Sequence, residues 1–156
     1  MHPYNGMAHL LSLDPQLLRA VEASCICLHV QRASRAVGRR YDDAFRHLDL
    51  NNWQFSLMTA IRGTEASSIN ELATLLGIDR TTMTRNLAVL QRRELLSMVQ
   101  DVRDSRVKRV SLTPQGQNLL LQALESWRVT NEAVKASVPT ASFPAMWRGL
   151  GSLSKT

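Results

Sequence analysis

The chain has 156 residues, of which 44% are hydrophobic and 21% are charged, with 7 Gly and 5 Pro. This composition is typical of one globular domain or two small lobes, and it excludes a disordered or collagen-like chain. The formal net charge of +6 and the pI near 10.1 favour a polyanionic partner, although a generally basic protein would have the same balance.

The sequence shows no sign of a membrane or secretion pathway. No apolar run approaches the roughly 20 residues that a membrane-spanning helix needs. Residues 1–10, MHPYNGMAHL, lack the charged start and apolar stretch of a signal peptide. Two cysteines do not make a disulfide framework, so we expect a cytoplasmic protein with reduced thiols and no membrane partner.

The first element that the sequence predicts is a long helix. Asp14 is a suitable N-cap and Pro15 suits the first helical position. Apolar residues then recur at helical spacing, so we expect one helix over about residues 15–47. Its apolar surface exceeds what one small lobe needs, which favours packing against a second chain.

Three short helices follow in the sequence. The first occupies residues 51–63, and the second begins with Ser68 and Glu71 at the spacing of a capping box. Gly77 suits the left-handed position that ends the second helix, and Asp79 caps the third. A turn of about three residues between two helices predicts a helix-turn-helix.

The third of these helices has an unusual outer face. Its apolar residues Met83, Leu87 and Leu90 recur at helical spacing and are expected to face a core. The outward positions are basic, rich in hydroxyls and short, with no acid among them: Thr81, Arg85, Ala88 and Arg92.

The remaining chain predicts a hairpin and two more helical segments. LLSMVQ and VKRVSLT read as strands, and the charged stretch DVRDSR between them reads as the tip of a β-hairpin. Thr113 and Pro114 predict the start of a helix to about residue 137, which Pro139 separates from an amphipathic segment at 143–153.

This order of elements resembles the MarR family of winged-helix transcription regulators. INELATLLGIDRTTMTRNLAVLQRRELL, DVRDSR and VSLTPQG stand where the family has its recognition helix, its D-x-R-D-x-R wing and its L-T-x-x-G helix start. The resemblance covers nearly the whole chain. It implies a mainly α fold with a small β-hairpin wing: a winged helix-turn-helix plus a helical dimerisation region. It divides one intertwined domain into an N-terminal dimerisation segment (1–50), a DNA-binding region (51–113) and C-terminal dimerisation helices (114–156).

The resemblance implies a homodimeric, sequence-specific repressor of transcription that binds a near-palindromic operator in double-stranded DNA and is released by a small-molecule ligand. Short outer residues let a recognition helix approach base edges, where Arg85 has the fork that reads guanine. Arg103 would reach the minor groove from the hairpin tip. The predicted DNA-binding residues are Arg80, Thr81, Thr82, Thr84, Arg85, Arg103, Arg106 and Lys108.

The acids of the wing are expected to act differently. Asp101 and Asp104 would repel phosphate, so we expect them to hold Arg103 or Arg106 by ion pairs. Lys108 and its neighbour Arg109 alternate across a strand, so only one of them can easily face the DNA backbone.

The effector implied by the resemblance is a small aromatic or phenolic compound, bound between the dimerisation helices and the winged helix. The candidate lining residues are His29, Arg32, Trp53 and Phe55.

The two cysteines leave two interpretations open. Cys27 falls where the hydroperoxide-sensing branch of the family has its reactive cysteine, and Tyr41 falls where that branch has a partner tyrosine; a second partner tyrosine is missing. The alternative function is therefore a thiol-based peroxide sensor. In the simpler interpretation both cysteines are buried apolar residues of one helix. Cys25 and His29 would supply only two metal ligands, so we expect no metal and no other cofactor.

Two other classes of function can be compared with this one. The sequence contains no nucleophile elbow, phosphate loop, metal-ligand cluster or paired-carboxylate motif, so we expect no enzyme activity. A winged-helix module that binds protein would be expected to lose the basic wing and recognition helix, and this chain retains both.

Overall fold

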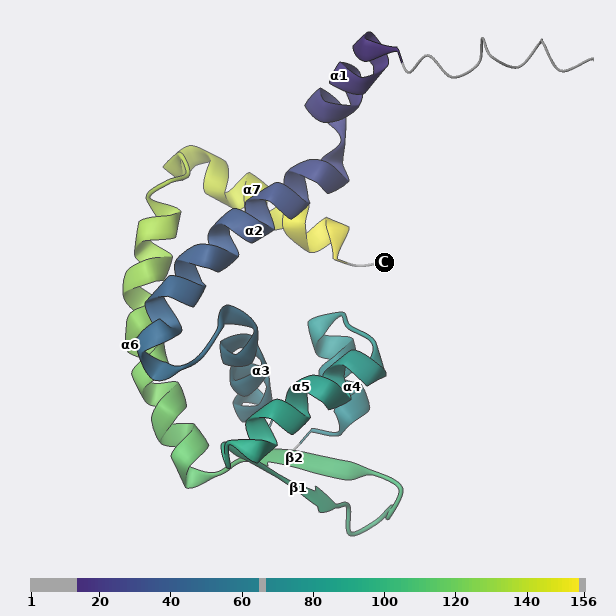
Figure 1. The fold of residues 1–156 in the computed structure, drawn as a ribbon, viewed down its shortest axis with the longest axis vertical. Coiled ribbons are helices and arrows are strands. Elements are labelled where there is room, and N and C mark those ends of the chain that lie inside the picture. Colours follow the sequence, from purple (N-terminus) through teal and green to yellow (C-terminus); the bar gives the residue numbers. More distant parts are fainter. Residues whose placement is uncertain (1–13, 65–66, 155–156) are drawn as a thin grey trace, which may run out of the picture. The chain divides into compact units, whose positions relative to one another are not determined.

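The computed structural model describes residues 14–64 and 67–154, so residues 1–10, which we expect not to form a signal peptide, lie outside the described residues. The chain forms two compact units, Met1–Val37 and Gly38–Thr156 (Figure 1). Within the described ranges, no helix has both the length and the apolar character to cross a membrane.

The predicted single helix at 15–47 is wrong, because Cys25 interrupts it. Helix α1 (Pro15–Ser24) begins at the predicted cap, and α2 (Ile26–Phe45) follows Cys25, whose φ of −71° and ψ of 105° are extended. Polar side chains on both sides of Cys25 hydrogen-bond to carbonyl groups of α1. Ser24 Oγ donates to the carbonyl of Ala20 (2.7 Å), and His29 Nε2 donates to that of Ala23 (3.2 Å). Such side-chain bonds compete with the helical backbone pattern, and the amphipathic periodicity does not reveal them.

The second unit continues through a 3-10 turn, η1 (Arg46–Leu48), into three helices: α3 (Asn52–Gly63), α4 (Ile69–Leu76) and α5 (Arg80–Arg92). The predicted caps are confirmed. Ser68 and Glu71 form a reciprocal capping box, Gly77 is left-handed with φ 64°, and Asp79 accepts from the backbone N–H of Thr82. The three-residue turn between α4 and α5 confirms the helix-turn-helix.

The predicted hairpin is confirmed as β1 (Leu96–Gln100) paired antiparallel with β2 (Lys108–Leu112). Its second strand also contacts the chain that leads into α4. The N–H of Val110 donates to the carbonyl of Ser67 (3.0 Å), and Ser68 forms an isolated bridge with Arg109. The hairpin is thus hydrogen-bonded to the start of the helix-turn-helix, beside which it lies in Figure 1.

The C-terminal part has the predicted helices. Thr113 caps α6 (Pro114–Lys135), the 3-10 turn η2 (Thr140–Ser142) follows, and α7 (Phe143–Leu153) ends the described chain. The fold class is therefore confirmed as mainly α with a small hairpin wing and a helix-turn-helix. The division at residues 50 and 113 stays a prediction.

One hydrophobic core holds the second unit together. It combines α3, α4, α5, the hairpin and α6, and Met83, Leu87 and Leu90 of α5 are fully buried in it, as predicted. Because these three residues fix one face of α5 to the core, the opposite face must point outward.

Candidate nucleic-acid interface

The outward face of α5 carries residues that the sequence predicted to bind DNA. Thr81, Thr84 and Arg85 are exposed, and Ala88 on the same face is half-buried. The hydroxyl of Thr82 donates to Asp79 Oδ2 (2.6 Å), and that of Thr84 donates to the carbonyl of Arg80 (2.9 Å). These two hydroxyls can still accept a hydrogen bond. The neighbours of Arg85 on the outward face, Thr81, Thr84 and Ala88, have short side chains.

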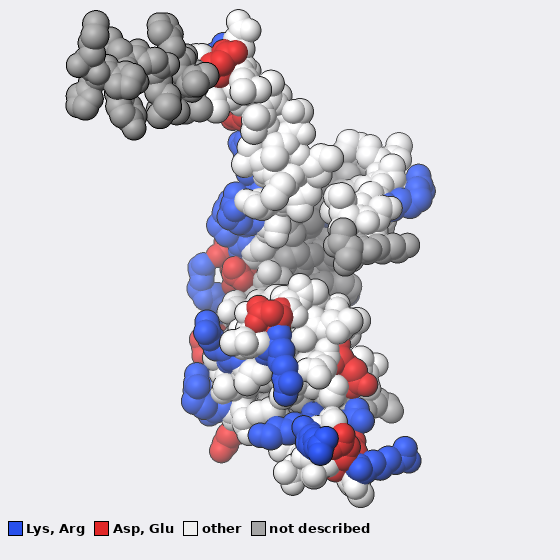
Figure 2. All heavy atoms as spheres, turned by 90° about the vertical axis from the view of Figure 1, so that its right-hand side faces the viewer, with Lys and Arg blue, Asp and Glu red and all other residues white. Residues whose placement is uncertain are grey.

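The wing presents its cations at the surface. The side chains of Arg103, Arg106 and Lys108 are exposed. Lys and Arg side chains, with acids between them, gather at the lower end of the face in Figure 2, where the hairpin lies in Figure 1.

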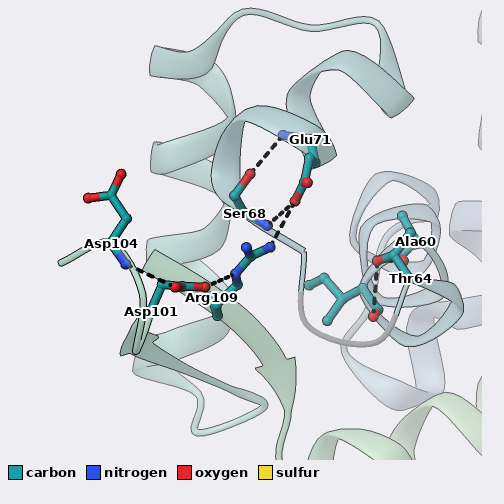
Figure 3. Close-up of polar contacts among 8 residues, drawn as sticks. Ala60, Thr64, Ser68, Glu71, Asp101, Asp104 and Arg109 are labelled. Atoms are coloured by element: carbon teal, nitrogen blue, oxygen red, sulfur yellow. Dashed lines mark hydrogen bonds and ion pairs between the residues drawn. The ribbon is translucent and has the colours of Figure 1, made fainter. Parts of the chain in front are cut away.

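The predicted ion pairs of the wing acids with Arg103 or Arg106 are wrong. Asp101 Oδ2 accepts from Arg109 Nε at 2.6 Å (Figure 3). The N–H of Asp101 bonds to the carbonyl of Val107 (2.9 Å), so Arg109 is its diagonal neighbour on the same face of the hairpin, and Arg103 lies beyond in the turn.

The wing acids bind the backbone of the predicted cations instead of their side chains. Asp101 Oδ1 accepts from the N–H groups of Arg103 (2.7 Å) and Asp104 (3.1 Å), and Asp104 accepts from the N–H of Arg106 (2.9 Å). The hydrogen bond from Arg109, followed by those from the two N–H groups, lowers the pKa of Asp101 to about 2. Asp101 therefore stays ionised at neutral pH.

A cleft of about 320 Å³ lies between the starts of α4 and α5 and the wing. All of its charged lining residues are cations: Arg80, Arg106 and Lys108. Three positive charges around one concave surface, contributed by separate elements, suit a phosphate group. Ser68 and Asn70 also line the cleft; the sequence reading assigned Ser68 only to the cap of α4 and made no prediction for Asn70.

A second cavity, of about 570 Å³, has aromatic walls and lies among α2, α3, α6 and α7 of the second unit. Phe55, one of the four effector candidates, lines it. The other lining residues were not among those candidates: Tyr41, Asn52, Ser56, Trp127, Asn131, Lys135, Phe143 and Trp147. These residues come from segments far apart in the sequence, so local patterns do not group them.

The other effector candidates, His29, Arg32 and Trp53, do not line this cavity. His29 and Arg32 are exposed on α2 in the first unit, and Arg32 lies 3.9 Å from Glu22. Trp53 is half-buried, and its Nε1 is buried with no hydrogen-bond partner among the described residues.

The cysteines are both free, with Cys25 half-buried and Cys27 exposed. They do not share one helix, contrary to the prediction, because Cys25 lies between α1 and α2. Gln31 Nε2 donates to Cys27 Sγ (3.2 Å), and the hydroxyl of Tyr41 donates to Asn131 Oδ1 (2.9 Å). Burial raises the pKa of Tyr41. Among residues 14–64 and 67–154, no three His, Cys, Asp or Glu side chains are grouped as metal ligands.

Comparison with known proteins identifies similar regulators. A model of the MarR family matches residues 48–107. The transcriptional regulator MosR of M. tuberculosis, solved in complex with DNA, is 37% identical with a TM-score of 0.77, over 85% of this chain and 95% of that chain.

Two more distant structures show the same fold. A MarR variant of E. coli complexed with operator DNA is 18% identical with a TM-score of 0.79, over 85% of this chain and 96% of that one. MepR of S. aureus, in a complex with DNA, is 18% identical with a TM-score of 0.75, over 82% of this chain and 95% of that one. No curated protein matches the sequence.

Proposed function

The chain belongs to the MarR family of transcription regulators, and on that premise we propose that it represses transcription as a homodimer on a near-palindromic operator until a small aromatic effector releases it. It is a DNA-binding regulator, and we propose no enzymatic step for it. The proposal places it in the cytoplasm, where a repressor meets its operator.

The observation that carries the DNA-binding proposal is the cationic cleft between the helix-turn-helix and the wing. Arg80, Arg106 and Lys108 converge on it, so a backbone phosphate seated there would fix the register of the protein on the duplex. With that register, α5 enters the major groove and Arg85 reads a guanine. Thr81 contacts a phosphate or a thymine methyl, and Arg103 enters the minor groove. Thr82 and Thr84, whose hydroxyls already donate within the protein, contact thymine methyls.

The dimer proposal rests on apolar side chains that the described chain leaves exposed. On α1 these are Leu17, Leu18 and Val21; on α6 and α7 they include Leu121, Val129, Trp147, Leu150 and Leu153. A second copy of the chain would cover them, with residues 1–50 and 114–156 forming the dimer and 51–113 binding DNA. A two-fold axis would place two α5 helices about one DNA turn apart.

The effector proposal rests on the aromatic cavity. Tyr41, Phe55 and Trp127 supply flat apolar surface, and Lys135 supplies a cation at the same cavity. An aromatic compound with a phenolate or carboxylate matches both features. The exposed thiol of Cys27 supports the alternative, a peroxide sensor, as a second candidate for the signal.

The proposal is tested by selecting genomic DNA fragments with the purified protein and then footprinting the fragments that bind. We expect enrichment of a two-fold related site, protected over two half-sites about one helical turn apart. An Arg85→Ala variant is the matched control, because it should retain weak binding but lose the enrichment. Recovery of fragments with no common site would overturn sequence-specific regulation.

A further inference from the structure

Arg109 is the one wing cation whose head group, in the described chain, is directed at two carboxylates. Its Nε donates to Asp101 Oδ2 at 2.6 Å, and its NH1 donates to Glu71 Oε2 at 3.2 Å (Figure 3). Asp101 belongs to the wing loop and Glu71 to α4, so one guanidinium joins two elements that are far apart in the sequence. The side chain is 37% exposed, in contrast to its exposed neighbour Lys108.

The α4 end of this contact is part of the helix cap. Glu71 Oε2 also accepts from the N–H of Ser68 (2.6 Å), while Ser68 Oγ accepts from the N–H of Glu71 (3.2 Å). The backbone of Ser68 is itself paired with Arg109 in the isolated bridge. The N-terminus of α4, the helix that precedes α5 in the helix-turn-helix, is thus fixed to β2 by both backbone and side-chain contacts.

The wing end of the contact fixes the loop that carries the minor-groove candidate. The same Asp101 that pairs with Arg109 accepts from the N–H groups of Arg103 and Asp104. A continuous set of hydrogen bonds therefore runs from the backbone of Arg103, through Asp101 and Arg109, to the start of the helix-turn-helix.

We propose that Arg109 is a positioning residue that sets the wing against the helix-turn-helix, so that Arg103 and Arg85 reach the minor and major grooves of one site together. The proposal rests on the DNA-binding function proposed above. Arg109 acts here through two carboxylates and does not itself need to contact DNA. Guanidinium is suited to this role, because its rigid planar fork holds two acceptors in fixed directions, whereas the three donors of an ammonium group rotate about a compact charge.

The rival role for Arg109 is a direct phosphate contact, and the two roles predict different behaviour. A phosphate contact depends on charge, so lysine would replace arginine, and removal of the charge would reduce the salt slope of binding by about one. A positioning role depends on the fork and on both acceptors. It also predicts energetic coupling with Arg103, because residues in one network are not additive.

The test measures affinity for a selected operator and for a scrambled duplex, by fluorescence anisotropy at several salt concentrations. The variants are Arg109→Met, Arg109→Lys and Glu71→Gln, each alone and combined with Arg103→Ala. Glu71→Gln is the mildest, because glutamine still completes a capping box but lacks the charge that pairs with Arg109. Lys108→Met is the matched control, since it removes the neighbouring exposed cation of the same strand.

We expect Arg109→Met and Arg109→Lys to weaken operator binding more than scrambled binding, and to shrink the penalty of Arg103→Ala. Coupling in such networks corresponds to about 2- to 100-fold in Kd. Glu71→Gln should also reduce the Arg103→Ala penalty, but by a smaller factor. Lys108→Met should weaken both duplexes alike and leave the Arg103→Ala penalty unchanged.

Full rescue by Arg109→Lys, or an unchanged Arg103→Ala penalty in all backgrounds, would overturn the positioning role. Thermal unfolding shows whether each variant is folded. If Arg109→Met does not fold, Glu71→Gln decides: coupling supports the proposal and wild-type behaviour overturns it. Equal affinity of the wild-type protein for operator and scrambled DNA would instead overturn the proposed function, which separates the two failures.

Discussion

The carbonyl group of Leu95 occupies the space that any side chain at Gly116 would need. A Cβ on Gly116 would lie 2.9 Å from the carbonyl carbon of Leu95 and closer still to its oxygen. Thr113 fixes this approach, because its N–H donates to the Leu95 carbonyl (3.2 Å) and its hydroxyl donates to that of Glu94 (2.7 Å). The start of α6 is thereby attached to the start of the hairpin, and the glycine of the L-T-x-x-G pattern has a steric reason.

Gly116→Ala should therefore lower the free energy of unfolding by about 1–3 kcal/mol, the usual range for overpacking. The obstacle is backbone, so no side chain can rotate away. Chemical denaturation at one fixed protein concentration measures the effect. The control is Gly149→Ala in α7, where nothing lies within 4 Å of a Cβ and no loss is expected. Equal unfolding midpoints for Gly116→Ala and the wild-type protein would contradict the clash.

Two residues with nearly the same left-handed backbone predict opposite effects of substitution. Gly77 has φ 64° and open space around a Cβ, whereas Glu94 has φ 58° without being glycine. Gly77→Ala should destabilise by about 1–2 kcal/mol, the cost of an L side chain in this conformation. Glu94→Gly should stabilise by less than about 1 kcal/mol, because relief of strain is partly offset by the entropy of the unfolded chain. The same denaturation experiment checks both, and a shift in one direction for both variants would contradict the backbone argument.

The local features of this fold were accessible from sequence because each depends on residues close together in the chain. The caps at Asp14, Ser68, Asp79 and Thr113 bond to groups within three residues, so their spacing alone predicted them. The buried face of α5 followed from helical periodicity.

The features that the sequence did not reveal depend on which of several possible residues a side chain contacts in the folded chain. Four cations follow Asp101 within eight residues, and the hairpin register selected Arg109 as its partner. The aromatic cavity joins Phe55 of α3 with Trp127 and Trp147, which lie more than seventy residues later. The break at Cys25 is accompanied by side-chain hydrogen bonds of Ser24 and His29, which the helical pattern of apolar residues does not reveal.

Substitutions of residues that contact bases and of residues that contact phosphates should change operator binding in different ways. Arg85→Ala should weaken operator binding by about 1–3 kcal/mol and relax base preference at one position in each half-site. Arg103→Ala should lose preference only at flanking A·T-rich steps, since the narrow minor groove there attracts arginine. Lys108→Ala should weaken all sequences alike and reduce the salt slope by about one. Binding selections and salt titrations measure these effects, and identical sequence-independent losses for all three would show that the assignment is wrong.

The Asp101 carboxylate should titrate far below the usual range. Its pKa is lowered from 3.8 to about 2, chiefly by the hydrogen bond from Arg109. A folded-state pKa below the unfolded value means that the contribution to stability is fully present above about pH 4 and is lost as pH falls through 2. NMR titration of the carboxyl carbon measures this pKa directly. In Arg109→Met it should rise toward 3.8 without reaching it, because the N–H groups of Arg103 and Asp104 still donate. An unchanged pKa in that variant would contradict the assigned cause.

Cys27 should not be the switch that controls operator binding. Rapid oxidation is favoured when a cation lies beside the sulfur, and the exposed thiol of Cys27 accepts, among the described residues, only from the neutral amide of Gln31. Tyr41, the residue matching the tyrosine of peroxide sensors, already donates its hydroxyl to Asn131 at 2.9 Å. A Cys27 thiolate would have to displace Asn131 as the acceptor of this hydroxyl, and Tyr41 lies fourteen residues after Cys27.

We therefore expect stoichiometric cumene hydroperoxide to leave operator affinity unchanged in the wild-type protein, in Cys27→Ser and in Cys25→Ser. An aromatic acid that fills the cavity beside Lys135 should release the operator in all three. Loss of binding on oxidation in the wild-type protein and in Cys25→Ser, but not in Cys27→Ser, would establish the thiol switch instead.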